Sequence, residues 1–293
     1  MIKFQESFKY RILDANKKVE IDYLKNIIFC IYCQVINAKN TIVERAIKLN
    51  NIKNFGQLFI NAIKNYRERE VLKWKVPGIS AIESENYQSL SAERLKEIVY
   101  FTSRAIEGLK LSINDKAAII SENRYEWVVS DFGCIFNKIV TVPIYTTMTT
   151  AQIKYILEHS ETKLCFVSNK LILEKVISVS KELPNLKRII CFNKIENFPD
   201  FVFNFEDFIK INEPEKDMVK KADDYFKNKS EQMNENDILT IIYTSGTTGI
   251  PKGVCLTHKN ILANIKSCSQ AFQIDHNDTF LSFLPLAHSY ERT

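Results

Sequence analysis

Glycine, long apolar runs and blocks of like charge are all scarce in this 293-residue sequence. It contains seven glycines, whereas a chain of this length would hold about 20 at the usual frequency of ~7%. The longest apolar stretch, Ile27 to Cys33, is interrupted at Gln34 and is shorter than the ~20 residues that a membrane-spanning helix requires. It also lies behind Glu20 and Asp22, too far from the N-terminus for a secretory signal. We therefore expect a cytoplasmic protein without a signal peptide or a membrane-spanning helix.

Charge of one sign is not concentrated in any part of the chain. Lys and Arg number 40 against 35 Asp and Glu, which gives a net charge of +5 that is spread along the sequence. Nucleic-acid binding normally needs a basic run or stripe, so we expect no nucleic-acid partner. The content of 45% hydrophobic and 26% charged residues is that of ordinary globular proteins and excludes disordered and collagen-like classes. The length allows about two domains.

Cysteine and histidine show no arrangement typical of a metal site. The seven cysteines are an odd number, scattered in a way that fits a reducing compartment. Cys30 and Cys33 form a single C-x-x-C, without the second pair that a zinc site would need. The four histidines have no paired spacing with cysteines or carboxylates. We expect the cysteines to pack in the core as small apolar residues, and we expect no structural metal.

The sequence divides into a helical arm, residues 1–70, and a main domain, residues 71–293. Apolar residues at helical spacing, such as Phe55 and Phe59, indicate an amphipathic helix near the end of the arm. Its apolar face could cover a core, dock a partner or lie on a membrane surface, and core cover is the favoured alternative. A mixed stretch, 74–90, is the expected entry to the main domain.

From residue 91 the pattern alternates between helices and short strands. Apolar residues at helical spacing predict helices, and short β-branched runs predict strands. The expected helices cover 91–109, 126–136, 151–159 and 171–183. The expected strands cover 116–121, 139–145, 164–168, 188–192, 237–244 and 280–284. This alternation predicts an α/β fold in which helices flank both faces of a parallel sheet. A charged, Asn-rich stretch near 193–236 is expected to be a connection between subdomains.

Three of the seven glycines, Gly246, Gly249 and Gly253, fall within eight residues. They belong to the segment Tyr-Thr-Ser-Gly-Thr-Thr-Gly-Ile-Pro-Lys-Gly at 243–253, which directly follows a buried strand. Glycine allows backbone N–H groups to converge on phosphate oxygens, and the hydroxyl side chains add neutral donors. Lys252 supplies a positive charge that is useful where a leaving group develops negative charge. The segment therefore predicts a cradle for a polyphosphate, placed where open α/β sheets bind ligands.

Two other interpretations of this segment are weaker. A flexible surface loop would tolerate hydroxyls and glycines, but it would not require their coincidence with a buried strand and a lysine. A Walker A loop, G-x-x-x-x-G-K-[ST], needs glycine where this chain has Pro251, and Ser or Thr where it has Gly253. The run Val254 to Thr257 also continues as a strand instead of opening a helix at once. The phosphate site of P-loop NTPases is therefore not expected.

The segment 243–253 resembles the signature phosphate loop of the adenylate-forming acyl-CoA synthetases, almost residue for residue. Three further parts of the chain agree with this family. They are Ser-Glu-Asn-Arg-Tyr-Glu-Trp at 121–127, Val-Pro-Ile-Tyr at 142–145 with Tyr-Ile-Leu-Glu-His-Ser at 155–160, and Leu-Pro-Leu-Ala-His-Ser-Tyr-Glu-Arg at 284–292. The likeness runs from about Trp74 to the last residue, and its last segment is similar to the long-chain fatty acyl-CoA synthetases. It implies the N-terminal part of the large α/β domain of such an enzyme.

The resemblance implies a two-step ligation that uses ATP, Mg²⁺, a fatty acid and coenzyme A. A fatty carboxylate attacks the α-phosphorus of ATP to give acyl-AMP and pyrophosphate, and the thiol of coenzyme A then displaces AMP. By the same likeness, the β and γ phosphates would be held by Thr244, Ser245, Gly246, Thr247, Thr248, Gly249 and Lys252. The Thr244 hydroxyl would lie near Mg²⁺, and Lys252 and His288 would serve catalysis, with His288 lining the place where the carboxylate meets the α-phosphate. Without the family, His288 would be interpreted as a helix-end or core histidine.

Several elements of the family have no counterpart in this sequence. These are the Tyr-Gly-x-Thr-Glu motif with its acidic Mg²⁺ ligand, the ribose-binding Asp, the hinge and the C-terminal domain with its lysine. We therefore expect a fragment that is inactive alone and binds phosphate at most weakly. Two alternatives stay open, a shortened non-catalytic relative and a ligase for another carboxylic acid. The arm could also hold the protein at the cytosolic face of an internal membrane, through the apolar stretch from Ile27 to Ile36.

Overall fold

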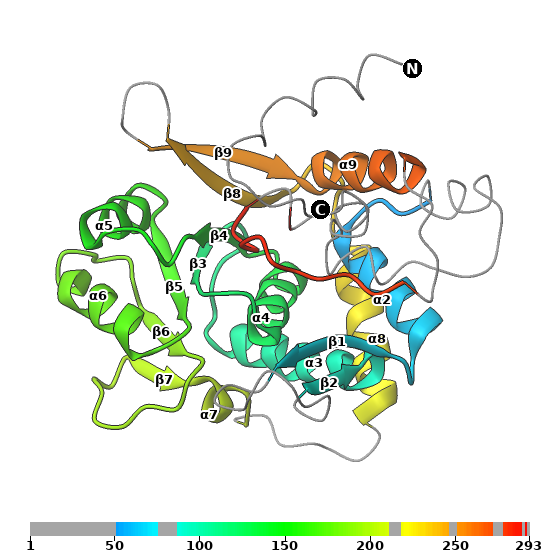
Figure 1. The fold of residues 1–293 in the computed structure, drawn as a ribbon, viewed down its shortest axis with the longest axis horizontal. Coiled ribbons are helices and arrows are strands. Elements are labelled where there is room, and N and C mark those ends of the chain that lie inside the picture. The colour runs from blue at the N-terminus through cyan, green and yellow to red at the C-terminus, as the bar shows by residue number, and fades with distance from the viewer. Residues whose placement is uncertain are drawn as a thin grey trace, which may run out of the picture.

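The computed structural model describes residues 51–75, 87–210, 218–245, 251–271, 278–288 and 291. These residues form two β-sheets and the helices that cover them (Figure 1). The helices are α2 (Phe55–Tyr66), α3 (Ala92–Gly108), α4 (Tyr125–Phe136), α5 (Thr150–His159), α6 (Lys170–Ser180), α7 (Phe205–Lys210), α8 (Met218–Glu231) and α9 (His258–Ala271). The strands are β1 (Glu70–Lys75), β2 (Tyr87–Ser91), β3 (Lys116–Ile120), β4 (Val140–Ile144), β5 (Thr162–Val167), β6 (Arg188–Cys191), β7 (Val202–Asn204), β8 (Ile238–Ser245) and β9 (Pro251–Thr257).

A seven-stranded sheet organises the described residues, in the order β7-β6-β5-β3-β4-β8-β9. The strands from β7 to β8 are parallel to their neighbours, and β9 runs antiparallel to β8 at one edge. Because β3 lies between β4 and β5, the chain leaves β3 toward one side of the sheet and then crosses back to the other. This architecture confirms the expected α/β fold.

Side chains of β3 alternate between the two faces of the sheet, as the pleat of a strand requires. Ala117 and Ile119 belong to the hydrophobic cluster formed with α2, α3, α4 and α8. Ala118 and Ile120 belong to the second cluster, formed with α5 and α6. Figure 1 shows α5 and α6 on one side of the sheet and α3 and α4 on the other. All four β3 residues are fully buried, because a parallel sheet is covered on both faces.

Helix α2 places its apolar face against the core. The Asn54 side chain caps the helix by accepting a hydrogen bond from Gln57 N at 2.9 Å. The Phe59 ring lies 4.7 Å from that of Phe132 and 5.4 Å from that of Phe226, measured between centroids. Core cover, the favoured alternative for this part of the arm, is therefore confirmed for α2.

Residues 1–50 lie outside the described part of the chain, and with them the pair Cys30 and Cys33. Core packing is confirmed for Cys134, Cys165 and Cys191, which are buried. It is wrong for Cys255, which is exposed on the edge strand β9, and Cys268 is partly buried. Among the described helices, none combines the length and the apolar character needed to cross a bilayer.

The stretch near 193–236 holds more structure than the sequence indicates. Strand β7 pairs with β6 in the main sheet, and α8 packs into the core through Ala222 and Phe226. A connection was expected here, and for these elements that expectation is wrong. A three-residue strand carries too short a pattern to detect, and α8 has one narrow apolar stripe on an otherwise charged helix.

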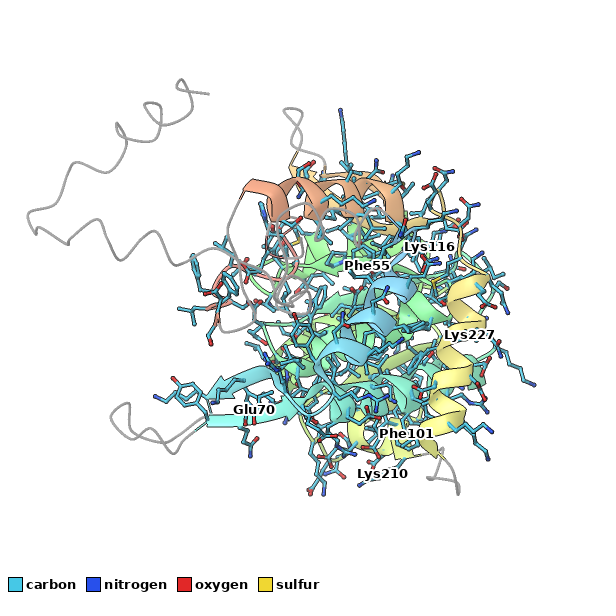
Figure 2. The ribbon with its side chains drawn as sticks, turned by 90° about the vertical axis from the view of Figure 1, so that its right-hand side faces the viewer. Phe55, Glu70, Phe101, Lys116, Lys210 and Lys227 are labelled. Carbon is cyan, nitrogen blue, oxygen red and sulfur yellow. The ribbon has the colours of Figure 1, made fainter. Side chains whose placement is uncertain are left out.

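Two further segments also differ from the expectation. The entry to the main domain holds β1 and β2, which pair as an antiparallel ribbon that extends away from the helical layer (Figure 2). The run 280–284, expected to be a strand, forms none. Its alternating apolar residues resemble a half-buried strand, but Leu281 and Phe283 are exposed, and a side chain binds the backbone of this run instead of a neighbouring strand.

Replacing Phe59 with Ala should destabilise the fold strongly, because its ring is 3% exposed and packs among other rings. The loss of such a side chain from a core costs about 3–5 kcal/mol. Urea unfolding followed by circular dichroism should show a lower midpoint with an unchanged slope. The matched control is Leu171→Ala on α6, where the side chain is 66% exposed and the expected change is within about 0.5 kcal/mol. Equal midpoints for the two variants would contradict the packing of α2 in the core.

Candidate functional site

The glycine-rich segment joins the two strands of the β8–β9 hairpin. Tyr243 pairs with Gly253, and Thr244 pairs with Lys252. Gly246, Thr247, Thr248 and Gly249, the centre of the expected phosphate cradle, lie outside the described residues. The structure therefore fixes the two ends of the cradle.

Thr244 and Lys252 are brought directly opposite each other. Residues paired in this way have Cβ atoms about 4.5–5.5 Å apart and project from the same face of the hairpin. Both side chains are exposed to solvent. The backbone of Ser245 continues the ladder by pairing with Pro251. A hydroxyl and an ammonium thus stand side by side where the segment begins and ends, and both groups can donate hydrogen bonds to an anion.

The hairpin also distinguishes this site from a Walker A loop. Strand β9 runs from Pro251 to Thr257, and α9 begins only at His258. In P-loop proteins a helix opens at the phosphate site and directs its N-terminal N–H groups at the ligand. The expectation of a strand after Lys252 is therefore confirmed.

Gly253 is required by close packing. A Cβ atom at this position would lie 2.8 Å from Ile241 Cγ2 and 3.1 Å from Tyr243 Cζ, which is too close for real side chains. All three glycines were expected to supply backbone freedom, but Gly253 gives room to an aromatic ring on the facing strand. Burial raises the pKa of Tyr243 to about 12, so its hydroxyl keeps its proton at neutral pH.

His288 lies on a different segment, 278–288. Asn123, three residues after the end of β3, holds this segment by hydrogen bonds. The Asn123 amide donates to Leu284 O at 2.6 Å, and Asn123 Oδ1 accepts from Leu286 N at 2.8 Å. Leu286 is fully buried, whereas the His288 side chain is exposed. Two segments that the sequence singled out separately are therefore joined, through Asn123 in the first and residues 284–286 in the second.

Ser282 and Glu291 extend this unit. Asn123 Nδ2 also donates to Ser282 Oγ at 2.9 Å. The side chain of Glu291 is almost completely buried; burial raises the pKa of this carboxyl, and a hydrogen bond with Ser282 opposes the rise. Sequence reasoning missed this network, because Asn123 and Ser282 are 159 residues apart and no local pattern links them.

An ion pair lies at the carboxyl ends of β3, β5 and β6. Arg124 binds Glu126 in a bidentate manner, with Nε–Oε2 at 2.8 Å and Nη2–Oε1 at 2.6 Å. The same guanidinium donates to Asn193 Oδ1 at 2.8 Å and to Ser168 O at 3.3 Å. Open α/β sheets often bind ligands at such a point, where neighbouring connections diverge. Here the polar side chains bind one another, so this network ties three strand ends together.

The comparisons with known proteins agree with the motifs. A family model described as AMP-binding enzyme matches residues 60–293. Fatty acyl-CoA synthetase B of Dictyostelium discoideum is 33% identical over 184 residues, which cover 63% of this chain and 27% of that protein. Long chain acyl-CoA synthetase 4 of Arabidopsis thaliana is 30% identical over 219 residues, which cover 68% of this chain and 30% of that protein. The chain spans less than a third of the length of these relatives.

The fold agrees as well. The crystal structure of a long-chain-fatty-acid-CoA ligase from Archaeoglobus fulgidus superposes with a TM-score of 0.63 at 19% identity, covering 88% of this chain and 44% of that one. Likeness at this identity concerns the fold alone. The resemblance to the N-terminal part of long-chain fatty acyl-CoA synthetases is confirmed by the sequence relatives. By the match of the family model to residues 60–293, the chain belongs to the AMP-binding enzyme family.

Proposed function

We propose that this chain supplies the ATP-phosphate-binding part of a long-chain fatty acid–CoA ligase. In the proposed reaction a fatty carboxylate displaces pyrophosphate from ATP to form acyl-AMP, and coenzyme A then displaces AMP to form acyl-CoA. The observation that carries the proposal is the cross-strand pair of Thr244 and Lys252 at the two ends of the hydroxyl-rich segment. The choice of reaction is supported by the family of the chain and by its relatives, which are named acyl-CoA synthetases.

The chemistry needs positioning and charge stabilisation more than covalent participation. Pyrophosphate leaves with a growing negative charge, and an adjacent ammonium with several N–H and O–H donors lowers the energy of that transition state. In the proposed site, Lys252 supplies the ammonium and Thr244 supplies a hydroxyl. Backbone and hydroxyl donors come from the residues between them, namely Ser245, Gly246, Thr247, Thr248 and Gly249. His288 lines the place where the carboxylate meets the α-phosphate.

Mg²⁺ would enter this site with ATP, as part of the substrate. It prefers six oxygen ligands, commonly phosphate oxygens and water with one or two carboxylates. Among the described residues, no three or more His, Cys, Asp or Glu side chains form a group that could hold a metal ion. The Thr244 hydroxyl could supply one neutral oxygen ligand to the Mg²⁺ of MgATP. The described residues provide no complete set of protein ligands for the ion.

Replacing Lys252 with Ala should lower adenylation by about 10²–10³-fold, because the developing charge loses one preorganised donor. The measurement is fatty-acid-dependent exchange of labelled pyrophosphate into ATP by the full-length protein, with palmitate as the acid. Lys259→Ala is the matched control, because Lys259 is exposed on neighbouring α9 and pairs only with Glu235 at the surface. Exchange that is unaltered in Lys252→Ala would overturn the proposed role, and a preference for benzoate over palmitate would overturn the long-chain assignment.

Replacing Asn123 with Ala should also reduce exchange, by about tenfold or more, because the segment that carries His288 loses its three hydrogen bonds to the Asn123 side chain. Pyrophosphate exchange with palmitate measures the effect, and thermal unfolding reports any loss of stability separately. Asn228→Ala on the exposed face of α8 is the control. A variant that folds and retains full exchange would show that this clamp does not position the catalytic segment.

We also propose a cytoplasmic protein whose N-terminal arm contacts the cytosolic face of an internal membrane. The apolar stretch from Ile27 to Ile36 supports the proposal. Deletion of residues 1–50, which leaves α2 and its cap in place, should reduce flotation with phosphatidylcholine–phosphatidylserine vesicles. Equal flotation of the intact and shortened chains would exclude this membrane contact.

A further inference from the structure

The last two residues of β8, Thr244 and Ser245, extend beyond its neighbour β4, because the pairing of Thr141 with Thr240 places Ile144 level with Tyr243. The ladder between β4 and β8 records the pair Thr141–Thr240, where Thr240 Oγ1 donates to Thr141 O at 2.9 Å. Strand β4 ends at Ile144, whereas β8 continues to Ser245. The end of the hairpin that carries the glycine-rich segment therefore needs support from another element.

Helix α5 provides that support with one hydrogen bond to each strand. Tyr155 Oη donates to Pro251 O at 3.2 Å, at the start of β9. His159 Nδ1 and Tyr243 Oη are 2.7 Å apart, near the end of β8. Pro251 and Tyr243 flank the segment 246–250 on either side. Both ends of this segment are thus tied to a single helix.

The two helix residues form one contact surface. Tyr155 and His159 are four residues apart, so they lie on the same face of α5. Their rings are stacked, with centroids 5.4 Å apart and planes inclined by 28°. The Tyr243 ring meets His159 edge-on, with centroids 5.7 Å apart and planes inclined by 87°. Gly253, which has no side chain, leaves the space that the Tyr243 ring occupies.

Helix α5 is itself a rigid support. A capping box between Thr149 and Gln152 fixes its first turn. Ile153 and Ile156 are fully buried against the sheet in the second hydrophobic cluster. Movement of the hairpin relative to this helix would break both hydrogen bonds and the ring contacts at the same time.

We propose that Tyr155 and His159 are positioning residues that hold the phosphate-binding segment in place through Pro251 and Tyr243. This inference rests on the proposed function of segment 246–250 as the phosphate cradle. Neither residue needs to touch the nucleotide. They fix the strand residues on either side of the segment, and a site whose supports are held in place binds its ligand more tightly.

The test measures MgATP binding to the intact 293-residue chain by isothermal titration calorimetry. His159→Leu and Tyr155→Phe should each weaken binding by about three- to tenfold, the size expected for loss of one hydrogen bond. His159→Asn should restore affinity to within about twofold of the original chain, because its side-chain oxygen can stand near the place of Nδ1. Glu158→Gln, exposed on the same helix, is the control.

A double variant distinguishes the hydrogen bond from general packing. His159→Leu and Tyr243→Phe remove two partners of the same bond, so the combination should bind MgATP no more weakly than either single variant. Tyr155→Phe acts on the other strand and should add its own loss to that of His159→Leu. Additive losses for the pair His159 and Tyr243, or an Asn variant as weak as the Leu variant, would overturn the proposed bond.

Hydrogen exchange of the chain without nucleotide provides the second readout. Amides of 243–245 and 251–253 should exchange faster in His159→Leu and Tyr155→Phe, while those of β3 stay unchanged. If His159→Leu and Tyr155→Phe leave both hydrogen exchange and MgATP affinity unchanged, the anchoring role is overturned. If Lys252→Ala still loses MgATP binding in that case, the proposed function stands. If the original chain and Lys252→Ala bind MgATP equally, the proposed function fails. Hydrogen exchange then still tests the anchor, because faster exchange in the α5 variants supports it and unchanged exchange contradicts it.

Discussion

The register of the β8–β9 hairpin is the constraint on which the proposed site depends. Because side chains alternate along a strand, a slip of one residue would send Thr244 and Lys252 to different faces. Gly253 opposes such a slip, since it is the position that has room beneath the aromatic ring of the facing strand. At the base of the hairpin, His258 N donates to Asp237 O at 3.2 Å as α9 begins. Packing near the tip and a hydrogen bond at the base thus fix one pairing.

The central sheet positions two segments that are far apart in the sequence. The hairpin is joined to β4 through Thr240 and to α5 near its tip, and both neighbours pack on the second hydrophobic cluster. The segment before His288 is bound by Asn123, directly beyond the carboxyl end of β3. Between these places, Arg124 and Glu126 satisfy each other's charge and join three strand ends. The rigid part of the fold therefore consists of paired strands and the polar contacts between them, and the exposed side chains proposed to meet the nucleotide stand at its margin.

The regular elements could be predicted from the sequence because their signals are local. The spacing of apolar residues gave helix 126–136, which the structure extends by one residue to Tyr125, and the strand expected at 237–244 corresponds to β8. Strand β7 was not predicted, because three residues carry little periodicity and its pairing with β6 depends on the rest of the sheet. The hydrogen bonds of Asn123 and the contacts of α5 with the hairpin were not predicted for a related reason. They join residues that are distant in sequence, and a hydrogen bond between distant side chains leaves no periodic pattern.

The low glycine content acquires a physical meaning in this structure. Several positions with left-handed backbone are occupied by other residues, at Lys110, Asn114, Lys138, Glu161 and Asn197. The chain therefore does not depend on glycine even where positive φ favours it. Two helical glycines, 56 and 133, lie where a Cβ atom would come within 2.8 Å of a neighbouring side chain, as at Gly253. Three of the four glycines among the described residues therefore stand where a side chain has no room, and the fourth, Gly108, has open space around it.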